Sequence, residues 1–375
     1  MTVNDRTNRR TFLQITALGA ALPASLAAGS NPTSDQPIRA AGSAMNSIEF
    51  ETELFRLREQ HYRRRRVDPI KEGFRPVGGS LADFAVVHHA GRYHFFAIER
   101  RLQEGTPFYP GHETFFCHAS TVDFSDWEVH DPVLWVQPGT WEEAHVWAPS
   151  ILPWNGEFVM AYTGVNRVCS QNIGLARSKD LFDWRRDPAD PITPTRGCDW
   201  AFWRADGPSS CRDPNLLLHE GRVYMTYTVN TKEGASCIAL TSTTDFKQWR
   251  DHGPILVGPA RGYECRLEGG HPQGQLESAN LVFRNGRWLL LVKEARRGSR
   301  IRNWIYASER PGPFDCHSGR EFWPGGSAVE IVKEKGSHAL LACMGTIRLG
   351  EVNWADEHPQ ARFLKTRAEL DEWLG

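Results

Sequence analysis

The stretch DPNLLLHEGRVYMTYT, residues 213–228, decides the fold because its pattern recurs along the chain. An apolar run, a turn glycine and a second apolar run are typical of a β-hairpin. The related stretches are DFAVVHHAGRYHFFAI from residue 83, APSILPWNGEFVMAYT from 148, SANLVFRNGRWLLLVK from 278 and a weaker VEIVKEKGSHALLACM from 329. The turn glycines are 65 residues apart for the first three intervals and 50 for the last: Gly91, Gly156, Gly221, Gly286 and Gly336.

A repeat of this length means one supersecondary unit per period, each burying its faces against its neighbours. Five units predict an all-β fold, a five-bladed β-propeller. Inner strands of a propeller begin around a central funnel, so residues at equivalent repeat positions converge there. The residues eight positions before the turn glycines are Asp83, Ala148, Asp213, Ser278 and Ala328. Glu277 stands directly before Ser278, so three carboxylates are predicted to face one pocket.

Composition limits the alternatives. The chain has 375 residues, of which 40% are hydrophobic and 24% charged, and the repeat favours one main domain over residues 49–375. A formal net charge of −1 argues against a nucleic-acid-binding protein, because it implies no sustained basic surface. The run from Arg63 to Arg66 is the exception, and we interpret it as a solvated segment before the first blade.

The N-terminus has the pattern of an export signal. Arg9 and Arg10 are followed by Phe12 and Leu13, then by the apolar stretch ITALGAALPASLAA. This indicates a twin-arginine signal peptide over residues 1–28, with an apolar region too short to span a membrane, and a linker over 29–48. The sequence therefore predicts a periplasmic or secreted protein.

Short helices are expected at both ends of the propeller, over residues 50–66 and over the C-terminal stretch QARFLKTRAELDEWLG. A second shared phrase begins at Asp123, Asp180 and Asp245 and ends in tryptophan. We interpret those indoles, Trp127, Trp184 and Trp249, as blade-packing anchors.

The eight cysteines show no C-x-x-C spacing, which argues against a zinc or redox site. Export permits disulfides, and Cys198 with Cys211, which bracket one loop, is the best candidate pair. Buried free thiols are at least as well supported for Cys237 and Cys343.

The carboxylates point to glycosidic bond hydrolysis. One carboxylic acid protonates the leaving oxygen, and a second carboxylate activates water or attacks the anomeric carbon. A third charge nearby tunes the proton affinity of the acid. Asp213 follows Arg212, which suits this modulating role, whereas an isolated strand-start aspartate such as Asp83 is more often a cap or turn residue.

Four phrases together resemble successive blades of the propeller glycoside hydrolases of families 43, 32, 68, 117 and 130: WAPSILPWNGEFVMAYTG, IGLARSKDLFDW, CRDPNLLLHEGRVYMTYT and LESANLVFRNGRWLLLVKE. The resemblance covers roughly residues 75–355. By position, family 43 implies that Asp83 is the general base, Asp213 the modulator and Glu277 the general acid. It further implies an oligo- or polysaccharide substrate and no required cofactor, and it leaves bound calcium open.

The subfamily stays open. Arg212-Asp213-Pro214 reproduces a phrase of families 32 and 68, but their Asn-Asp-Pro-x-Gly phrase is absent around Asp83, and Glu277-Ser278 replaces their Glu-Cys. The layout favours an arabinofuranosidase or xylosidase of the family 43 type, and the alternative is a retaining β-fructosidase. Carboxyl groups roughly 6.5–9.5 Å apart would indicate an enzyme that inverts the anomeric configuration of the sugar. Groups roughly 5–5.5 Å apart would indicate one that retains it.

Loops that enter the funnel supply further candidates, because tryptophan faces edged by charged groups suit sugar rings. The predicted substrate-binding residues in these loops are Glu143, His145, Trp147, Trp200 and Trp203, to which we add Arg212 and His271. The resemblance implies Glu330 as well, because fifth blades of relatives often carry a glutamate near this point. Trp141 and His338 are weaker candidates, for which packing and a satisfied buried histidine are the competing interpretations. Two other functions remain, a non-catalytic carbohydrate-binding propeller and a phosphorolytic enzyme of the family 130 type.

Overall fold

A computed structural model describes residues 63–77, 79–101, 113–188, 191–258, 276–294, 302–324, 328–343 and 345–375. The chain divides into two units, Met1–Asn46 and Ser47–Gly375, and all the described residues belong to the second. The predicted signal peptide and linker, most of the predicted N-terminal helix, Cys265 and His271 lie outside them.

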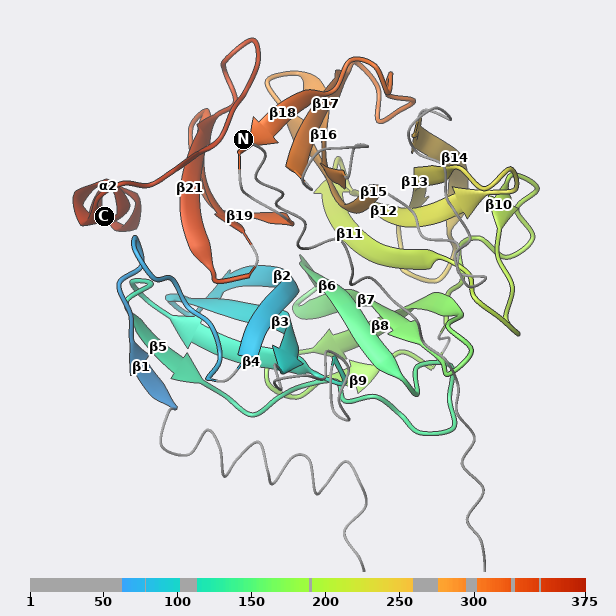
Figure 1. The fold of residues 1–375 in the computed structure, drawn as a ribbon, viewed down its shortest axis with the longest axis horizontal. Coiled ribbons are helices and arrows are strands. Elements are labelled where there is room, and N and C mark those ends of the chain that lie inside the picture. The colour runs from blue at the N-terminus through green and yellow to red at the C-terminus, as the bar shows by residue number, and fades with distance from the viewer. Residues whose placement is uncertain are drawn as a thin grey trace, which may run out of the picture. The chain divides into compact units, whose positions relative to one another are not determined.

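Five separate antiparallel sheets form the blades (Figure 1). The first is β1 (Arg64–Arg66), β2 (Gly79–His89), β3 (Arg92–Arg101), β4 (Phe116–Thr121) and β5 (Asp126–Val129). The second is β6 (His145–Trp154), β7 (Glu157–Val165), β8 (Gln171–Ser178) and β9 (Arg185–Arg186). The third is β10 (Ala201–Phe202), β11 (Cys211–His219), β12 (Arg222–Thr231), β13 (Ser236–Thr243) and β14 (Arg250–Val257).

The fourth blade is β15 (Leu276–Arg284), β16 (Arg287–Glu294), β17 (Arg302–Ser308) and β18 (Arg320–Trp323). The fifth is β19 (Val329–Lys335), β20 (His338–Cys343), β21 (Arg348–Asn353) and β22 (Arg362–Phe363). The strands β2, β6, β11, β15 and β19 are innermost and lie around the centre, as Figure 1 shows. The prediction of an all-β five-bladed propeller is confirmed.

The turn glycines mark the hairpins as predicted. In the first four blades both central turn residues have positive φ, for example Asn155 at 49° before Gly156 at 80°. Such a turn twists in the same sense as the strands it joins, which is why Asn-Gly favours it. The hairpins therefore fix the register at the tip of each inner strand.

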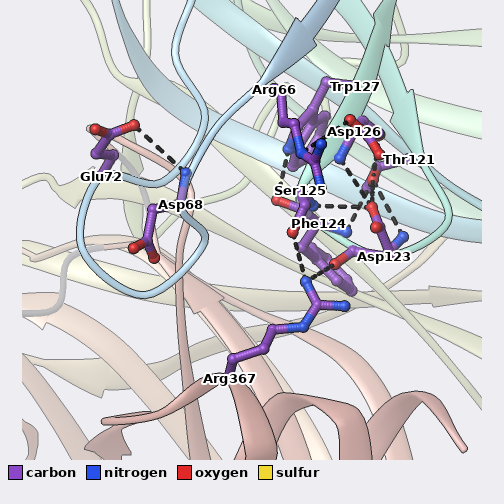
Figure 2. Close-up of polar contacts among 10 residues, drawn as sticks. All are labelled: Arg66, Asp68, Glu72, Thr121, Asp123, Phe124, Ser125, Asp126, Trp127 and Arg367. Carbon is purple, nitrogen blue, oxygen red and sulfur yellow. Dashed lines mark hydrogen bonds and ion pairs between the residues drawn. The ribbon is translucent and has the colours of Figure 1, made fainter.

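The repeated aspartate phrase builds a turn at the outer side of a blade (Figure 2). Thr121 Oγ1 accepts a hydrogen bond from the Phe124 amide at 2.9 Å, and Asp123 Oδ1 accepts one from the Ser125 amide at 2.9 Å. Trp127 donates its indole N–H to the Phe124 carbonyl at 2.8 Å and stacks on Phe74 with ring centroids 4.2 Å apart.

Blades two and three repeat this turn. Trp184 donates to the Leu181 carbonyl at 3.1 Å, and Trp249 packs edge-on against Phe246 with centroids 5.9 Å apart. The three tryptophans pack in or against the blade cores, so their prediction as anchors is confirmed.

The C-terminal helix α2 (Arg367–Leu374) joins blade five to blade one. Thr366 caps it and forms a capping box with Glu369, which explains why the helix begins later than the predicted stretch. Leu370 and Trp373 are buried in the same apolar cluster as side chains of both blades. Arg367 reaches the Asp123 carbonyl at 3.2 Å (Figure 2), so the helix seals the ring where the first and last blades meet.

The arginine run corrects our prediction. Arg64–Arg66 form β1, which pairs with β5 as the outermost strand of blade one, rather than part of a helix or a segment before that blade. The predicted solvation is confirmed, because Arg64 and Arg66 are exposed. Acidic side chains beside this edge explain the difference, since Arg63 pairs with Asp131 at 2.9 Å. The backbone hydrogen bonds of the blade edge and these charges together favour a strand.

The cysteine prediction is also corrected. Cys198 and Cys211 are both free thiols, and Cys198 Sγ donates instead to the Pro194 carbonyl at 3.4 Å and faces Asp251 at 3.5 Å. Cys237 and Cys343 are buried free thiols, which is one of the two interpretations considered for them. The described part of the chain has no helix long and apolar enough to cross a membrane.

Candidate active site

The residue eight positions before each hairpin glycine lines one central pocket. These residues are Asp83, Ala148, Asp213, Ser278 and Ala328. The last four have φ values of 46°, 55°, 50° and 45°. In blades one to four the pairing of the inner strand shifts by one residue around this position, which is the signature of a β-bulge. The bulge turns one residue of each of these inner strands toward the pocket. The positions that are equivalent in the sequence repeat therefore also lie together in space.

Two of the pocket carboxylates are joined through Ser278. Its hydroxyl donates to Asp83 Oδ1 at 2.9 Å, and its backbone amide donates to Asp213 Oδ2 at 3.2 Å. The same Asp213 oxygen accepts from Thr228 Oγ1 at 3.4 Å, and the Asp213 amide donates to Thr163 at 2.9 Å. Residues of other blades therefore hold both carboxylates in fixed positions.

Arg212 links the third carboxylate to this pair. Its side chain is 9% exposed, and its guanidinium lies 3.4 Å from Asp213 Oδ2 and 3.1 Å from Glu277 Oε1. A planar guanidinium presents several donors in a fixed fork, which suits two acceptors at once. Arg212 thus bridges carboxylates of blades three and four.

Glu277 has a second cation. Lys293, directly opposite it on β16, places its ammonium 2.8 Å from Glu277 Oε2. Burial alone would raise the pKa of Glu277, but Lys293 and then Arg212 outweigh it and lower the pKa to about 2. Glu277 is therefore an ionised carboxylate at neutral pH in this arrangement.

Asp213 behaves in the opposite way. Burial raises its pKa to about 6, with Asp83 and Glu277 adding to the rise and Arg212 opposing it. One carboxyl of the cluster consequently gains a proton in mildly acidic solution while its neighbour stays charged. Pairs of acids pushed apart in this way are characteristic of acid–base sites.

Glu330 also lines the pocket, together with Asp83. Burial, and after it the charge of Asp83, raises the pKa of Glu330 well above its usual range. The side-chain amide of Asn280 donates to Glu330 Oε2 at 3.5 Å. The direction of this shift favours the protonated form of Glu330.

Sequence reasoning missed Lys293 and the hydroxyl of Ser278. A lysine at the end of the apolar run of β16 was a usable signal, since a charge rarely enters such a strand without a partner. Arg100 was missed too. It pairs with Glu113 at 2.7 Å, and the charges of Asp83 and Glu277 help to raise the pKa of its guanidinium.

The predicted aromatic platforms Trp200 and Trp203 lie away from the residues that line this pocket. Trp200 donates its indole N–H to Asp251 at 3.0 Å, and Trp203 donates its own to the Gln171 carbonyl at 2.9 Å. Both pack against the core of blade three, which is the arrangement of loop anchors.

The candidates on β6 lie nearer to the pocket. Trp147 stacks with His145, ring centroids 5.3 Å apart, and directly precedes the pocket-lining Ala148. Glu143 pairs with Arg167 at 3.4 Å, so this carboxylate already has a partner.

The weaker candidates have other surroundings. Trp141 stacks on Tyr162 with centroids 6.0 Å apart, which is the packing interpretation considered for it. His338 is exposed beside the hairpin of blade five, so it is not the buried residue or funnel contact considered for it. His271 lies outside the described residues.

The chain is similar to known glycoside hydrolases. Residues 79–266 match the family described as glycosyl hydrolases family 32 N-terminal domain. Among solved structures, a family 32 β-fructofuranosidase from Bombyx mori superposes with a TM-score of 0.62 at 14% identity, over 85% of this chain and 70% of that one. No curated protein matches the sequence.

Two other solved structures share the fold. A thermostable family 43 glycoside hydrolase has a TM-score of 0.56 at 18% identity, over 77% of this chain and 95% of its own. A sucrose-6-phosphate hydrolase from Lactobacillus gasseri has a TM-score of 0.59 at 17% identity, over 84% of this chain and 67% of its own. These identities are low, so the likeness concerns the fold.

Proposed function

This chain belongs to glycosyl hydrolase family 32, whose N-terminal domain it carries, and we propose that it hydrolyses fructofuranosides with Asp83 and Glu277 as the acting carboxyl groups. The observation that carries the proposal is a cluster of carboxylates from three blades: Asp83 and Asp213 line one pocket, and Arg212 joins Glu277 to Asp213. Hydrolysis of this kind requires two carboxyl groups and water, and no cofactor.

The family match and the Arg212-Asp213-Pro214 phrase favour a fructoside. The Bombyx mori relative is a β-fructofuranosidase, and a variant of it has been solved with sucrose. The arabinofuranosidase or xylosidase prediction rested on the family 43 layout of the three carboxylates, and it becomes the second candidate. A substrate panel that contains both kinds of sugar distinguishes them.

Each carboxyl group has a role in the proposal. Asp83 attacks the anomeric carbon, Glu277 gives a proton to the leaving oxygen, and water then cleaves the sugar from Asp83. Asp213 and Arg212 hold sugar hydroxyls and set the charge on Glu277. Ser278 keeps Asp83 oriented, because its hydroxyl occupies one lone pair of the carboxylate and leaves the other oxygen available.

The proton on Glu277 needs an explanation, since its two cations keep it ionised. A substrate that enters between Glu277 and Lys293 weakens that ion pair and raises the proton affinity of Glu277. Glu330 is the competing proton donor, because it lines the pocket with Asp83 and its raised pKa favours the protonated form. The two assignments predict different variants to be defective.

The first experiment is hydrolysis by the purified protein of sucrose, fructo-oligosaccharides, aryl arabinofuranosides and aryl xylosides. Asp83→Asn and Glu277→Gln are measured beside it, with Glu334→Gln as a matched control. Glu334 lies on the same strand as Glu330 but pairs with Arg284 outside the pocket. We expect turnover of a fructoside, lost in both site variants and kept in the control.

No turnover of any sugar by a folded wild-type protein, with sugar binding retained, would support a non-catalytic carbohydrate-binding propeller. Turnover of only the arabinofuranoside or xyloside would replace the sugar and leave the carboxylates in place. Turnover indifferent to Asp83→Asn would overturn the site assignment.

The second experiment separates the two proton donors. Fructosyl fluoride needs little protonation of its leaving group, whereas sucrose needs it. The variant of the true donor should therefore lose far more activity on sucrose than on the fluoride, by about 10²–10⁴-fold. If Glu330→Gln shows this pattern and Glu277→Gln does not, the donor is Glu330.

Export is a separate proposal. We infer from Arg9-Arg10 and the apolar stretch after them that residues 1–28 are a twin-arginine signal and that the protein acts in the periplasm or outside the cell. Replacing both arginines by lysine should retain the protein, with its signal uncleaved, in the cytoplasmic fraction. Unchanged export of that variant would contradict the proposal.

A further inference from the structure

Blade one contains three histidines on a single face, none of them among the pocket residues. His94 lies on β3, His118 on β4, and His130 one residue beyond β5. His94 is opposite Ser120, and His118 is opposite Phe96, two residues further along β3. Because side chains alternate across a strand, these positions share one face of the sheet. The His130 amide also donates to the His118 carbonyl at 2.9 Å, so the segment directly after β5 continues the sheet beside β4.

The imidazoles of His94, His118 and His130 form a compact group, which we call the histidine trio. One ring nitrogen from each histidine lies within 4.8 Å of the other two. His94 Nδ1 and His118 Nε2 are 3.0 Å apart, and His130 Nε2 is 2.8 Å from Ser120 Oγ. His118 is fully buried, and its Nδ1 has no hydrogen-bond partner among the described residues.

Aromatic rings enclose the trio. Phe96 stacks on His118 with centroids 4.3 Å apart. Phe182, from the outer turn of blade two, contacts all three imidazoles with centroid distances of 5.8, 5.0 and 5.1 Å. Phe182 is itself 47% exposed, so its ring lies between the trio and solvent at the contact of two blades.

We propose that His94, His118 and His130 form a binding site for one divalent transition-metal ion, such as zinc. Imidazole nitrogen is a preferred ligand of zinc, nickel and copper, and Zn–N bonds are about 2.0–2.1 Å long. Nitrogens around a tetrahedral zinc are therefore roughly 3.4 Å apart. The 3.0 Å pair already has nearly this spacing, and the third nitrogen, from His130, lies within 4.8 Å of both. Water takes the fourth position, as in three-histidine sites.

The charge state of the trio agrees with a ligand role. Burial, then the neighbouring His130 and Arg92, lowers the pKa of His94 to about 4, and burial lowers the pKa of His118 too. Neutral imidazoles present the lone pairs that a metal needs. Ser120 contacts His130 from the same blade, which fixes its ring orientation.

Blade three offers an internal comparison. Ser242 and His252 repeat the Ser120–His130 contact with the same 2.8 Å distance. Counted from the shared hairpin and turn phrases, Tyr224 and Leu240 occupy the places of His94 and His118. The blade fold thus accounts for one serine–histidine pair, whereas blade one adds the two further histidines.

The role is structural rather than catalytic. A metal held by β3, β4 and the segment after β5 ties three parts of blade one together beneath the turn of blade two. The trio is not among the residues that line the carboxylate pocket. Metal binding should therefore stabilise the fold, with little effect on turnover.

The test uses the purified full-length protein without a histidine tag, stripped with a chelator and titrated with Zn²⁺ in a calorimeter. We expect one ion per chain at micromolar or tighter affinity, and a rise in Tm when zinc is added. Co²⁺ as a spectroscopic probe should give the visible bands of a low-coordinate nitrogen site. Weak binding of several ions without a Tm rise would overturn the proposal.

Variants locate the ion. His94→Gln and His130→Gln should each lower zinc affinity at least tenfold and remove the Tm rise. His252→Gln, the matched control in blade three, should change neither. An equal loss in the control, or full binding by both trio variants, refutes the site. Because buried substitutions can unfold the protein, the cobalt spectrum of the wild-type chain decides the matter if the variants fail to fold.

Discussion

Ser278 donates its hydroxyl to Asp83 Oδ1 at 2.9 Å although the two residues are 195 positions apart in the chain. One belongs to blade four and the other to blade one, and each stands eight residues before its hairpin glycine. The contact shows how a propeller assembles a reactive cluster: each blade delivers one residue to the centre. Catalytic geometry then depends on how well the five blades are held together.

Removing the Ser278 hydroxyl should weaken activity without harming the fold. Alanine already occupies the same position in blades two and five, with φ near that of Ser278, so Ser278→Ala is compatible with the backbone. A hydrogen bond to a charged group contributes about 1.5–3 kcal/mol, which corresponds to roughly a 10- to 100-fold loss in kcat/KM. Steady-state kinetics and a thermal melt check this. Unchanged kcat/KM would show that Asp83 needs no orientation by Ser278.

Asp213→Asn should abolish activity and stabilise the protein at neutral pH. The folded-state pKa of Asp213 is raised from 3.8 to about 6, so the folded protein holds the proton more tightly than the unfolded chain. Stability from this group therefore falls as pH rises from about 4 to about 6 and stays low above that range. Asparagine avoids the buried charge and tolerates the positive φ of 55°.

Urea unfolding at pH 4 and pH 7.5 measures this effect. The variant should gain on the order of 1–3 kcal/mol over wild type at pH 7.5 and little at pH 4. A variant that is less stable at both pH values would mean that the ion pair with Arg212 outweighs the cost of burial.

Glu277 and Lys293 should behave as one energetic unit. Breaking a fully buried ion pair from one side leaves the other charge uncompensated, which costs about 3–5 kcal/mol. The cost here should be lower, because the Glu277 side chain is 34% exposed. Glu277→Gln is the more severe change, because it removes the carboxylate that Lys293 pairs with, whereas Arg212 still faces Glu277 in Lys293→Met. The double variant with Glu277→Gln should lose much less than the sum of the two single variants.

Unfolding free energies of the four proteins in this cycle give the coupling. Lys293→Met should also raise the pKa of Glu277, because the strongest cation near it is gone. If Glu277 is the proton donor, the alkaline limb of the pH–rate profile moves to higher pH in that variant. Additive unfolding energies would indicate that the two side chains act independently.

Trp373→Ala should open the seal between blades five and one. Trp373 is 6% exposed and belongs to the cluster that joins α2 to both blades. Truncation of a buried tryptophan costs about 3–5 kcal/mol. Chemical denaturation measures the loss, with Arg310→Ala on an exposed turn as a control. A loss below about 1 kcal/mol would mean that the strands alone close the ring.

The sequence by itself determined the repeat and the number of blades. Asn-Gly and related turns fix hairpins through backbone preferences that act over a few residues, so the blades could be counted. The same counting brought Asp83, Asp213 and Ser278 to one ring, because equivalent positions of a propeller converge. Glu330 has a different offset from its glycine, and its place in the pocket was predicted from the family resemblance rather than from the count.

Only the tertiary structure decided which charged side chain faces Glu277. Counting outward from the hairpin, where Arg284 pairs with Arg287, sets Glu277 opposite Glu294, an acid against an acid. The bulge at Ser278 shifts the register by one residue and brings Lys293 opposite Glu277 instead. Such a shift depends on how neighbouring blades crowd the inner strand, which no local pattern encodes.

The histidine trio shows the same limit. Its members are 24 and 12 residues apart, and their shared face depends on the pairing of three strands and on a phenylalanine from the next blade. Local sequence determines turns and strands because those interactions are short in range. Ion pairs, proton affinities and metal ligands depend on contacts between strands and blades, and only the assembled structure decides them.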